Sequence, residues 1–349
     1  MVECAHVLRD IDLPDTAPAG LVFAGAATSL EILRFMAEAE RRGLRAALVT
    51  ITGLTGSSSR PVGTLMGVAE DGCFAGSFSG GCIEAAVVAE AVEAIRDGRP
   101  RQVRYGAGSP YIDIRLPCGG GVDLLFQPRP DPDVIRQALS RLEARQPLAL
   151  AQGSSGSLHI PVDTAQRLTG WQGETFISWY APCLRLVVVG HGAESLALVQ
   201  LGLTSGSQMT LLTPDERLVS SGKRLGAHTV LLTTSGPSPA LVADPWSAVV
   251  FLFHDHAWEP SLLEQVISEP WFFIGAMGSQ RTQENRLNQL REHGIPEEVL
   301  ARITAPLGLI PSARDPMTLA LSALAQVVDS YRQIAANPSG DLVFHDRRT

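Results

Sequence analysis

The chain has 349 residues, of which 45% are hydrophobic and 18% are charged, so it is long enough for two domains and apolar enough to bury a large core. The formal net charge of −8 argues against a nucleic-acid partner, because an acidic surface repels phosphate backbones. Of the 28 basic residues only Lys223 is a lysine, and it does not follow a glycine-rich phosphate loop, which excludes a P-loop nucleotide site.

The cysteines and the apolar segments indicate the cellular compartment of the protein. Five cysteines without a Cys-x-x-Cys pair are typical of reduced thiols in a cytosol. The N-terminal residues lack the apolar stretch of a signal peptide, and no apolar run reaches the roughly 18–20 residues of a membrane span. We therefore expect a cytoplasmic protein without a membrane partner.

The first half of the sequence predicts a mixed α/β domain. Helices are expected over 30–42, 83–96 and 134–145, and strands over 45–52, 64–69, 73–78, 102–105 and 122–127. Residues 152–182 have the weakest pattern, with room for a modest hairpin, and they contain the predicted domain junction. The predicted domains are 1–178 and 179–349.

The second half alternates strands and helices, which predicts a doubly wound parallel sheet of the Rossmann type. Strands are expected over 184–189, 208–213, 229–233, 248–253 and 271–274, and helices include 196–201, 284–292 and 317–334. Overall the sequence predicts an α/β protein in which an N-terminal α/β domain precedes a Rossmann-like domain.

A damaged dinucleotide fingerprint follows the first strand of the second half. Gly190 and Gly192 allow the tight turn and close backbone approach that a diphosphate needs, but Ser195 occupies the third glycine position. Thr213 stands where an acid would hold the ribose. Two interpretations stay open: a site for NAD(P) or another nucleotide, and glycines that only let strand and helix pack.

Two further groups follow strands of the same predicted sheet, at the edge where such sheets bind ligands. His254 and His256 share one face of an extended chain, as half of a metal site or as ordinary loop histidines. A turn that opens a helix is suited either to an anion or to a simple helix cap. Its candidate ligands are Gly275, Gly278, Ser279 and Arg281.

Two cysteines in the first half have glycine-rich surroundings. Gly80 and Gly81 precede Cys82, which we expect in the first turn of a helix, where the peptide dipoles favour a thiolate. Glu84 is placed as a capping-box acid. Cys118 precedes Gly119 in a similar setting. Both cysteines are therefore candidate reactive groups.

A loop after the first strand offers hydroxyl groups, flexible backbone and one guanidinium, which suit an anionic ligand or a solvated loop equally well. The residues concerned are Gly56, Ser57, Ser58 and Arg60.

Residues 56–66, 79–84 and 118–120 together resemble the XdhC/CoxI family, and the Gly190 turn with residues 254–256, 273–279 and 305–309 resembles its C-terminal Rossmann domain. The likeness spans about residues 30–328. It implies an accessory protein, rather than an enzyme, that binds the molybdenum cofactor (molybdopterin). Such a protein supports cofactor sulfuration by a cysteine desulfurase and inserts the cofactor into an apo-molybdenum hydroxylase of the xanthine dehydrogenase type.

On this interpretation Cys82 is a molybdenum ligand and, with Cys118, the reactive thiol, because a thiolate suits a soft metal. The other candidate ligands, including Glu84, His254 and Arg281, surround the cofactor, and exchange chemistry is compatible with a homodimer. Thr213 and Ile310 depart from the family pattern and weaken the transfer of nucleotide-binding residues. The alternatives are an NAD(P)-dependent oxidoreductase and an adaptor that binds only proteins.

Overall fold

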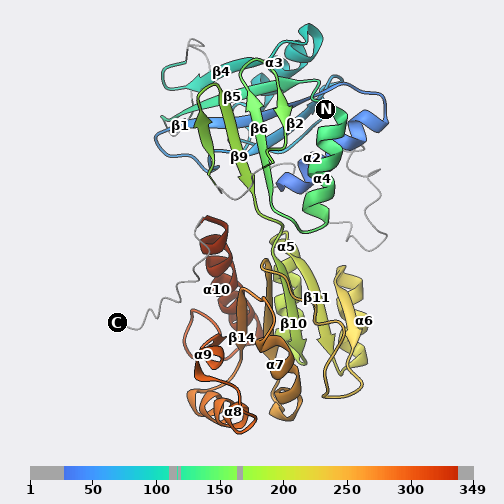
Figure 1. Ribbon diagram of the computed structural model, residues 1–349, viewed down its shortest axis with the longest axis vertical. Helices are drawn as coiled ribbons and strands as arrows, with labels where there is room; N and C mark the ends of the chain where they lie inside the picture. Colours follow the sequence, from blue (N-terminus) through green and yellow to red (C-terminus); the bar gives the residue numbers. More distant parts are fainter. Residues whose placement is uncertain (1–26, 110–115, 117–118, 163–167, 337–349) are drawn as a thin grey trace. The chain divides into compact units, whose positions relative to one another are not determined.

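The computed structural model describes residues 27–109, 116, 119–162 and 168–336. The chain forms two compact units that divide between Pro182 and Cys183. The boundary expected at 178–179 falls inside strand β9 (Thr175–Tyr180), which belongs to the first unit. Each unit is built around its own sheets and its own apolar cores (Figure 1).

The first unit contains a five-stranded antiparallel sheet in the order β3-β2-β1-β5-β4. Its strands are β1 (Ala46–Thr55), β2 (Leu65–Ala69), β3 (Phe74–Ala75), β4 (Arg101–Gly106) and β5 (Gly121–Pro128). The helices of the unit are α2 (Ser29–Arg41), α3 (Glu84–Asp97) and α4 (Pro132–Glu143). All eight elements were predicted, with shifts of a few residues at their ends.

Both faces of this sheet are buried, in keeping with the burial of residues 46–52 of β1 on both sides of the strand. Leu48 packs with α2 and α4 in one core, whereas Val49 packs with α3 in the other, and both side chains are fully buried. Burial of each such side chain stabilises the fold by about 1.5–3 kcal/mol. Figure 1 shows α2 beside α4, where the two helices pack together.

A second, four-stranded antiparallel sheet completes the first unit, in the order β7-β6-β9-β8. Its strands are β6 (Leu148–Gly153), β7 (Leu158–His159), β8 (Gly170–Gln172) and β9. The sequence predicts no more than a hairpin here. The central pair β6 and β9 is joined to the first sheet by a buried hydrogen bond from the Thr50 hydroxyl to Gln152 Oε1 (3.0 Å).

The second unit contains a six-stranded parallel sheet in the order β12-β11-β10-β13-β14-β15. Numbered from the first strand of the unit, this order is 3-2-1-4-5-6, that of dinucleotide-binding folds. The strands are β10 (Arg185–Gly190), β11 (Gln208–Thr213), β12 (His228–Leu231), β13 (Ser247–Leu252), β14 (Phe273–Ala276) and β15 (Ile303–Thr304).

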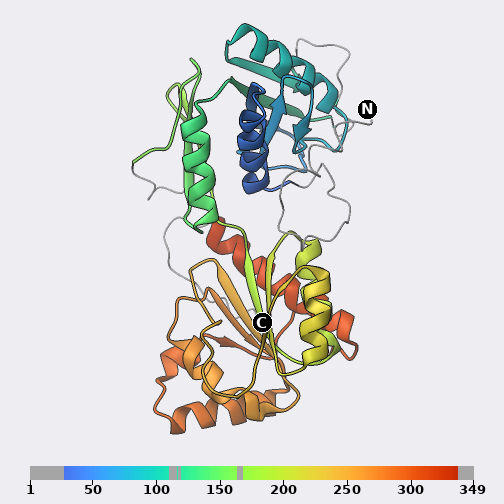
Figure 2. The same cartoon turned by 90° about the vertical axis from the view of Figure 1, so that its right-hand side faces the viewer.

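Helices cover both faces of the parallel sheet, so every inner strand is apolar on both sides. Leu186 and Val188 of β10 face α5 and α10, whereas Val187 and Val189 face the side of α7 and α8. Figure 2 shows α6 in yellow beside the sheet and α10 in red crossing it. The helices are α5 (Ala193–Thr204), α6 (Glu216–Leu225), α7 (Pro260–Ile267), α8 (Gln280–Glu292), α9 (Glu297–Leu300) and α10 (Pro316–Ala336), with a 3-10 turn at His256–Trp258.

The predicted fold class is therefore confirmed: an α/β unit is followed by a doubly wound, Rossmann-like unit. Within the described part of the chain, no helix combines the length and the apolar character needed to cross a bilayer.

Candidate functional site

Three glycine-rich loops gather at one end of the five-stranded sheet. At this end β1 stops at Thr55, β5 starts at Gly121 as its partner, and β3 leaves toward residues 76–83. The loops after β1 and before β5 lie against each other: a Cβ added at Gly56 would stand 3.3 Å from the Gly120 Cα. The topology thus brings together segments that are more than 60 residues apart in sequence.

The 77–83 loop is organised around the buried carboxylate of Glu84, which accepts six hydrogen bonds from it. Ser77 Oγ (2.7 Å) and Ser79 Oγ (2.7 Å) are two of the donors. The other donors are backbone N–H groups of Phe78 (3.0 Å), Ser79 (2.8 Å), Gly81 (2.8 Å) and Ile83 (3.2 Å). The sequence predicts Glu84 as a capping-box acid, and the bond from the Gly81 N–H has that form. Its predicted contact with a cofactor stays a prediction.

The protonation state of Glu84 follows from these bonds. Burial alone would raise the pKa of this carboxyl group, but hydrogen bonds from the Ser77 hydroxyl and from the N–H and hydroxyl of Ser79 lower it to about 2. The carboxylate is therefore ionised at neutral pH, and it adds a negative charge at the N-terminus of α3, where negative charge is favourable.

Cys82 lies at the tip of this loop with an exposed side chain. The prediction that it falls in the first turn of a helix is wrong, because α3 begins at Glu84 with Ile83 as its N-cap. The adjacent glycines are required by backbone conformation: φ is +74° at Gly80 and +122° at Gly81, and an added Cβ would meet nothing within 4 Å at either. The loop therefore presents the thiol to the surroundings.

The predicted anion loop after β1 has a rigid backbone. Ser58 Oγ donates to the Arg60 carbonyl (3.0 Å) and accepts from the Arg60 N–H (3.2 Å). The Gly63 carbonyl accepts a hydrogen bond from the Tyr180 hydroxyl of β9 (2.9 Å). Gly56 has φ +75°, and Ser57 is exposed. These contacts hold Arg60 in place at the rim of a pocket.

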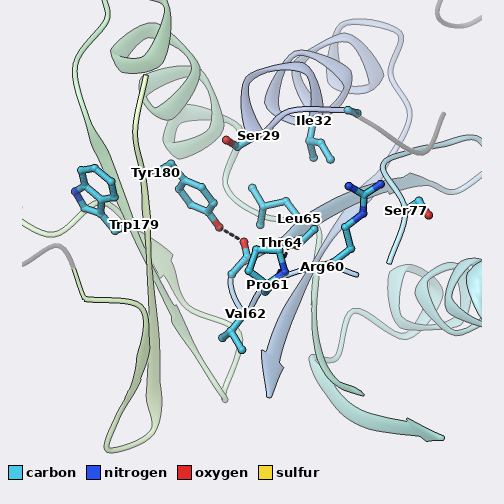
Figure 3. Close-up of a pocket in the computed structure, with 12 residues that line it drawn as sticks. Ser29, Ile32, Arg60, Pro61, Val62, Thr64, Leu65, Ser77, Trp179 and Tyr180 are labelled. Carbon is cyan, nitrogen blue, oxygen red and sulfur yellow. Dashed lines mark hydrogen bonds between the residues drawn. The ribbon is translucent and has the colours of Figure 1, made fainter. Parts of the chain in front are cut away.

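This pocket has a volume of about 280 Å³ and lies within the first unit (Figure 3). Arg60 and residues 61–65 form one wall, β9 contributes Tyr180, and α2 contributes Ser29 and Ile32. Ser77 completes the lining, so the pocket borders the loop that carries Cys82.

Gly119 follows the second glycine-flanked cysteine of the sequence and lies within the described residues. Cys118 lies outside the described residues. Gly119, with φ +68°, donates its N–H to the Leu116 carbonyl (2.9 Å) in the turn before β5. Gly119 thus lies at the same end of the sheet as the loops of Gly56 and Cys82.

The remaining predicted ligands lie in the second unit, at the carboxyl edge of the parallel sheet. Gly190 ends β10 next to β13, where a Cβ would stand 2.5 Å from the Leu252 carbonyl oxygen. Gly192 has φ +96° and is the N-cap of α5. A Cβ at Gly192 would lie 2.7 Å from Glu194 Oε1. Close packing therefore accounts for both glycines.

The residues at this edge do not fit a bound dinucleotide. The buried Glu194 carboxylate lies in the first turn of α5, where a diphosphate would need positive charge, and its Oε1 is 2.6 Å from His254 Nε2. Thr213, at the end of β11, is fully buried and carries no charge for a ribose. The Ser195 hydroxyl bonds to the His191 carbonyl (3.2 Å). An acid in the phosphate position disfavours NAD(P).

The turn after β14 is a helix cap. Ser279 is the N-cap of α8 and accepts the Thr282 N–H (3.1 Å). Gly275 is packed against Leu307, and Gly278 has φ +142°, while Arg281 is exposed. In the described part of the chain, no cluster of three or more His, Cys, Asp or Glu side chains is arranged to hold a metal ion. The predicted ligands thus form two groups, one in each unit.

Three residues of the described sites are not among those predicted from the sequence. Ser77 and Tyr180 have ordinary sequence contexts, and only the pairing of distant segments brings them to the pocket. The role of Glu194 could have been predicted from the sequence, because an acid two residues after Gly192 lies at the N-terminus of the following helix.

Comparisons with known proteins agree with this division into two units. Residues 39–106 match the model of the XdhC and CoxI family, and residues 186–327 match that of the XdhC Rossmann domain. The chain is 38% identical over 296 residues to the molybdenum cofactor insertion chaperone PaoD of Escherichia coli (strain K12), covering 85% of this chain and 86% of PaoD.

More distant relatives share the architecture. The chain is 24% identical over 193 residues, 54% of each protein, to a probable component of xanthine dehydrogenase from Bacillus subtilis (strain 168). A crystal structure described as a xanthine dehydrogenase from Bacillus halodurans superposes with a TM-score of 0.71 at 21% identity, covering 90% of this chain and 100% of that one, which shows a common fold. The two family matches and the similarity to PaoD show that this chain belongs to the XdhC/CoxI family.

Proposed function

We propose that this protein binds the molybdenum cofactor as cargo and inserts it into an apo-molybdenum hydroxylase of the xanthine dehydrogenase type. The observation that carries the proposal is the exposed Cys82 on a loop pre-organised by Glu84, in a chain 38% identical to an insertion chaperone. Delivery requires a ligand that binds reversibly, and an accessible thiol on a rigid loop provides one.

The chemistry of the loop suits this cargo. A thiolate is a soft ligand that matches a metal held by dithiolene sulfur. Because Glu84 satisfies the N–H groups of Gly81 and Ile83, the loop needs no rearrangement to present its sulfur. Pre-organisation of this kind strengthens binding by removing the cost of ordering the loop. Gly56, Ser57, Ser58, Cys118 and Gly119 belong to the proposed site.

The wider role is part of the same proposal. While bound, the cofactor is sulfurated by a separate cysteine desulfurase, and the protein acts in the cytoplasm, as a homodimer. The second unit serves this role without NAD(P), because Glu194 occupies the N-terminus of α5.

Anaerobic cofactor retention tests the proposal. The purified protein is mixed with cofactor released from a molybdoenzyme and passed over a desalting column, and molybdenum and pterin are measured in the protein fraction. We expect near-stoichiometric retention by the wild type and a loss of roughly tenfold or more by Cys82→Ser, because a metal–sulfur contact is removed. Cys183→Ser, which alters a thiol of the second unit, is the matched control and retains the cofactor.

Activation of an apo-molybdenum hydroxylase completes the test. We expect the loaded wild type, but not Cys82→Ser, to restore client activity. Equal retention by wild type and Cys82→Ser would remove Cys82 as a ligand. Client binding without any cofactor uptake would identify an adaptor instead of a carrier.

A further inference from the structure

The pocket beside Arg60 has a composition that suits an oxyanion. Arg60 is the one charged side chain among the described residues that line it. The hydroxyl groups of Thr64, Ser77 and Tyr180 in the lining already donate to other protein groups, so the guanidinium is the principal donor that the pocket offers to an anion. A guanidinium presents a planar set of N–H donors that matches the oxygens of a phosphate. The pocket lining therefore favours an anionic, oxygen-rich group.

The first turn of α2 adds to this preference. Figure 3 shows the Arg60 side chain extending toward this turn, near Ile32, and Ser29 of the same turn lines the pocket. The N-terminal end of a helix carries partial positive charge, which attracts an anion. In α2 the acid Glu31 offsets part of this charge, so the guanidinium of Arg60 supplies most of the attraction. The acid of this turn, Glu31, is directed into the capping box, where it accepts the N–H and hydroxyl of Thr28 (2.6 and 2.9 Å).

The wall opposite α2 is held rigidly. Tyr180 donates its hydroxyl to the Gly63 carbonyl, and burial raises the pKa of this phenol above its ordinary value, so it stays a donor at neutral pH. Figure 3 shows the Tyr180 ring on the pocket side of its strand. The Thr64 hydroxyl donates to the Pro61 carbonyl (2.8 Å). The segment that carries Arg60 is thus tied to β9 by one hydrogen bond and closed on itself by another.

The pocket is coupled to Cys82 through Ser77. The Ser77 hydroxyl donates to Glu84 and accepts the Gly80 N–H (3.0 Å). Cys82 follows Gly80 by two residues, so their Cα atoms are within roughly 7 Å of each other. Ser77 in the pocket lining and the thiol of Cys82 therefore belong to one short loop and are five residues apart in sequence.

We propose that this pocket binds the phosphate ester of the carried cofactor, so that Arg60 holds its phosphate while Cys82 holds its metal. The inference rests on the proposed function and deepens it, because it assigns the organic half of the cargo to residues outside the Cys82 loop. The ester belongs to the pterin itself or to a nucleotide joined to it, and both present the same chemistry to Arg60.

Metal-free molybdopterin separates the two contacts, because it carries the phosphate without the metal. Its dissociation constant is measured anaerobically by equilibrium dialysis against the folded full-length chain. We expect Cys82→Ser to bind it as the wild type does, and Arg60→Gln to bind it roughly ten- to a hundredfold more weakly. Arg60→Lys keeps the charge but loses the paired donors, so its dissociation constant is expected to lie between those of the wild type and Arg60→Gln.

Arg136→Gln is the matched control, since Arg136 is a half-exposed arginine of α4 outside the pocket and its surface ion pairs contribute little. Competition against molybdopterin by cytidine monophosphate in the wild type assigns the pocket to a nucleotide phosphate. Competition by inorganic phosphate but not by cytidine monophosphate assigns it to the pterin phosphate.

Two results would overturn the inference in distinguishable ways. If Arg60→Gln and Arg60→Lys bind metal-free molybdopterin within twofold of the wild type and of Arg136→Gln, the pocket does not hold the phosphate, and the proposed function still stands. If the wild type retains neither the metal-free nor the molybdenum-loaded cofactor, the proposed function itself fails.

Discussion

Glu84 shows how a single buried carboxylate converts a glycine-rich segment into a defined loop. Six donors converge on its two oxygens, and four of them are backbone N–H groups that have no strand partner. Glycine flexibility alone would cost conformational entropy. The acid offsets this cost, so the loop carrying Cys82 is ordered by the protein's own contacts.

Replacement of Glu84 by Gln is expected to destabilise the protein by about 2–4 kcal/mol, because the amide nitrogen cannot accept the N–H groups that face it. Urea unfolding at pH 7 measures this change. Glu93→Gln, on the exposed face of the same helix, is the control and is expected to change the free energy of unfolding by less than about 1 kcal/mol. Equal effects of the two variants would contradict the assigned role of Glu84.

The lowered pKa of Glu84 predicts the direction of a pH effect. The folded-state pKa is about 2 and the ordinary value is 4.5, so the unfolded chain binds the proton more tightly. The stabilisation, roughly 3 kcal/mol, is fully present above about pH 5 and is lost as the pH falls toward 2. Urea unfolding of the wild type and of Glu84→Gln between pH 7 and pH 3 should show their stabilities converging. A constant difference would refute this linkage.

At the scale of elements, the parallel sheet has the strand order of a nucleotide-binding fold, but the residues at its carboxyl edge do not suit a nucleotide. β10 and β13 are adjacent strands at the point where the strand order reverses, which is the usual ligand position in such folds. There the first turn of α5 carries Glu194 paired with His254. Repulsion between this carboxylate and a diphosphate disfavours the ligand that such folds usually bind at this position.

NADH titration followed by nicotinamide fluorescence tests this interpretation. We expect no saturable binding by the wild type at micromolar NADH, since Glu194 repels the diphosphate and Thr213 offers no carboxylate to the ribose. The double variant Glu194→Ala with Thr213→Asp is expected to gain weak binding. Micromolar binding accompanied by turnover in the wild type would instead support an NAD(P)-dependent oxidoreductase.

At the scale of the whole molecule, the two units are independent in their cores. The sheet of the second unit is complete without any strand from the first, and its two apolar clusters contain no described residue before Leu184. Residues 183–349 expressed alone are therefore expected to unfold cooperatively in a circular-dichroism melt.

The same fragment is expected to retain no cofactor, because Cys82 and Arg60 lie in the first unit. Leu252→Asp in the fragment, which places a charge in a fully buried position, is the negative control and abolishes the cooperative transition. A non-cooperative melt of the unmodified fragment would show that the second unit depends on the first.

Local patterns were sufficient for most elements. The apolar runs of β10 and β13 and the amphipathic segment of α2 were predicted because their periodicity reflects which faces are buried. The sheet of β6 to β9 was missed because β7 and β8 are only two and three residues long and because its contact with the first sheet joins the distant residues Thr50 and Gln152. Contacts between distant residues produce no periodic pattern of apolar residues in the sequence.

The sequence by itself determined the glycine-flanked thiol at Cys82, the parallel architecture of the second unit and the family to which both belong. Only the tertiary structure decided that Glu84 gathers six donors of its loop beyond a simple capping contact, that Glu194 occupies the phosphate position and that Tyr180 closes a pocket beside Arg60. The physical reason is that the role of a polar side chain depends on which donors and charges surround it after folding, and those come from remote segments.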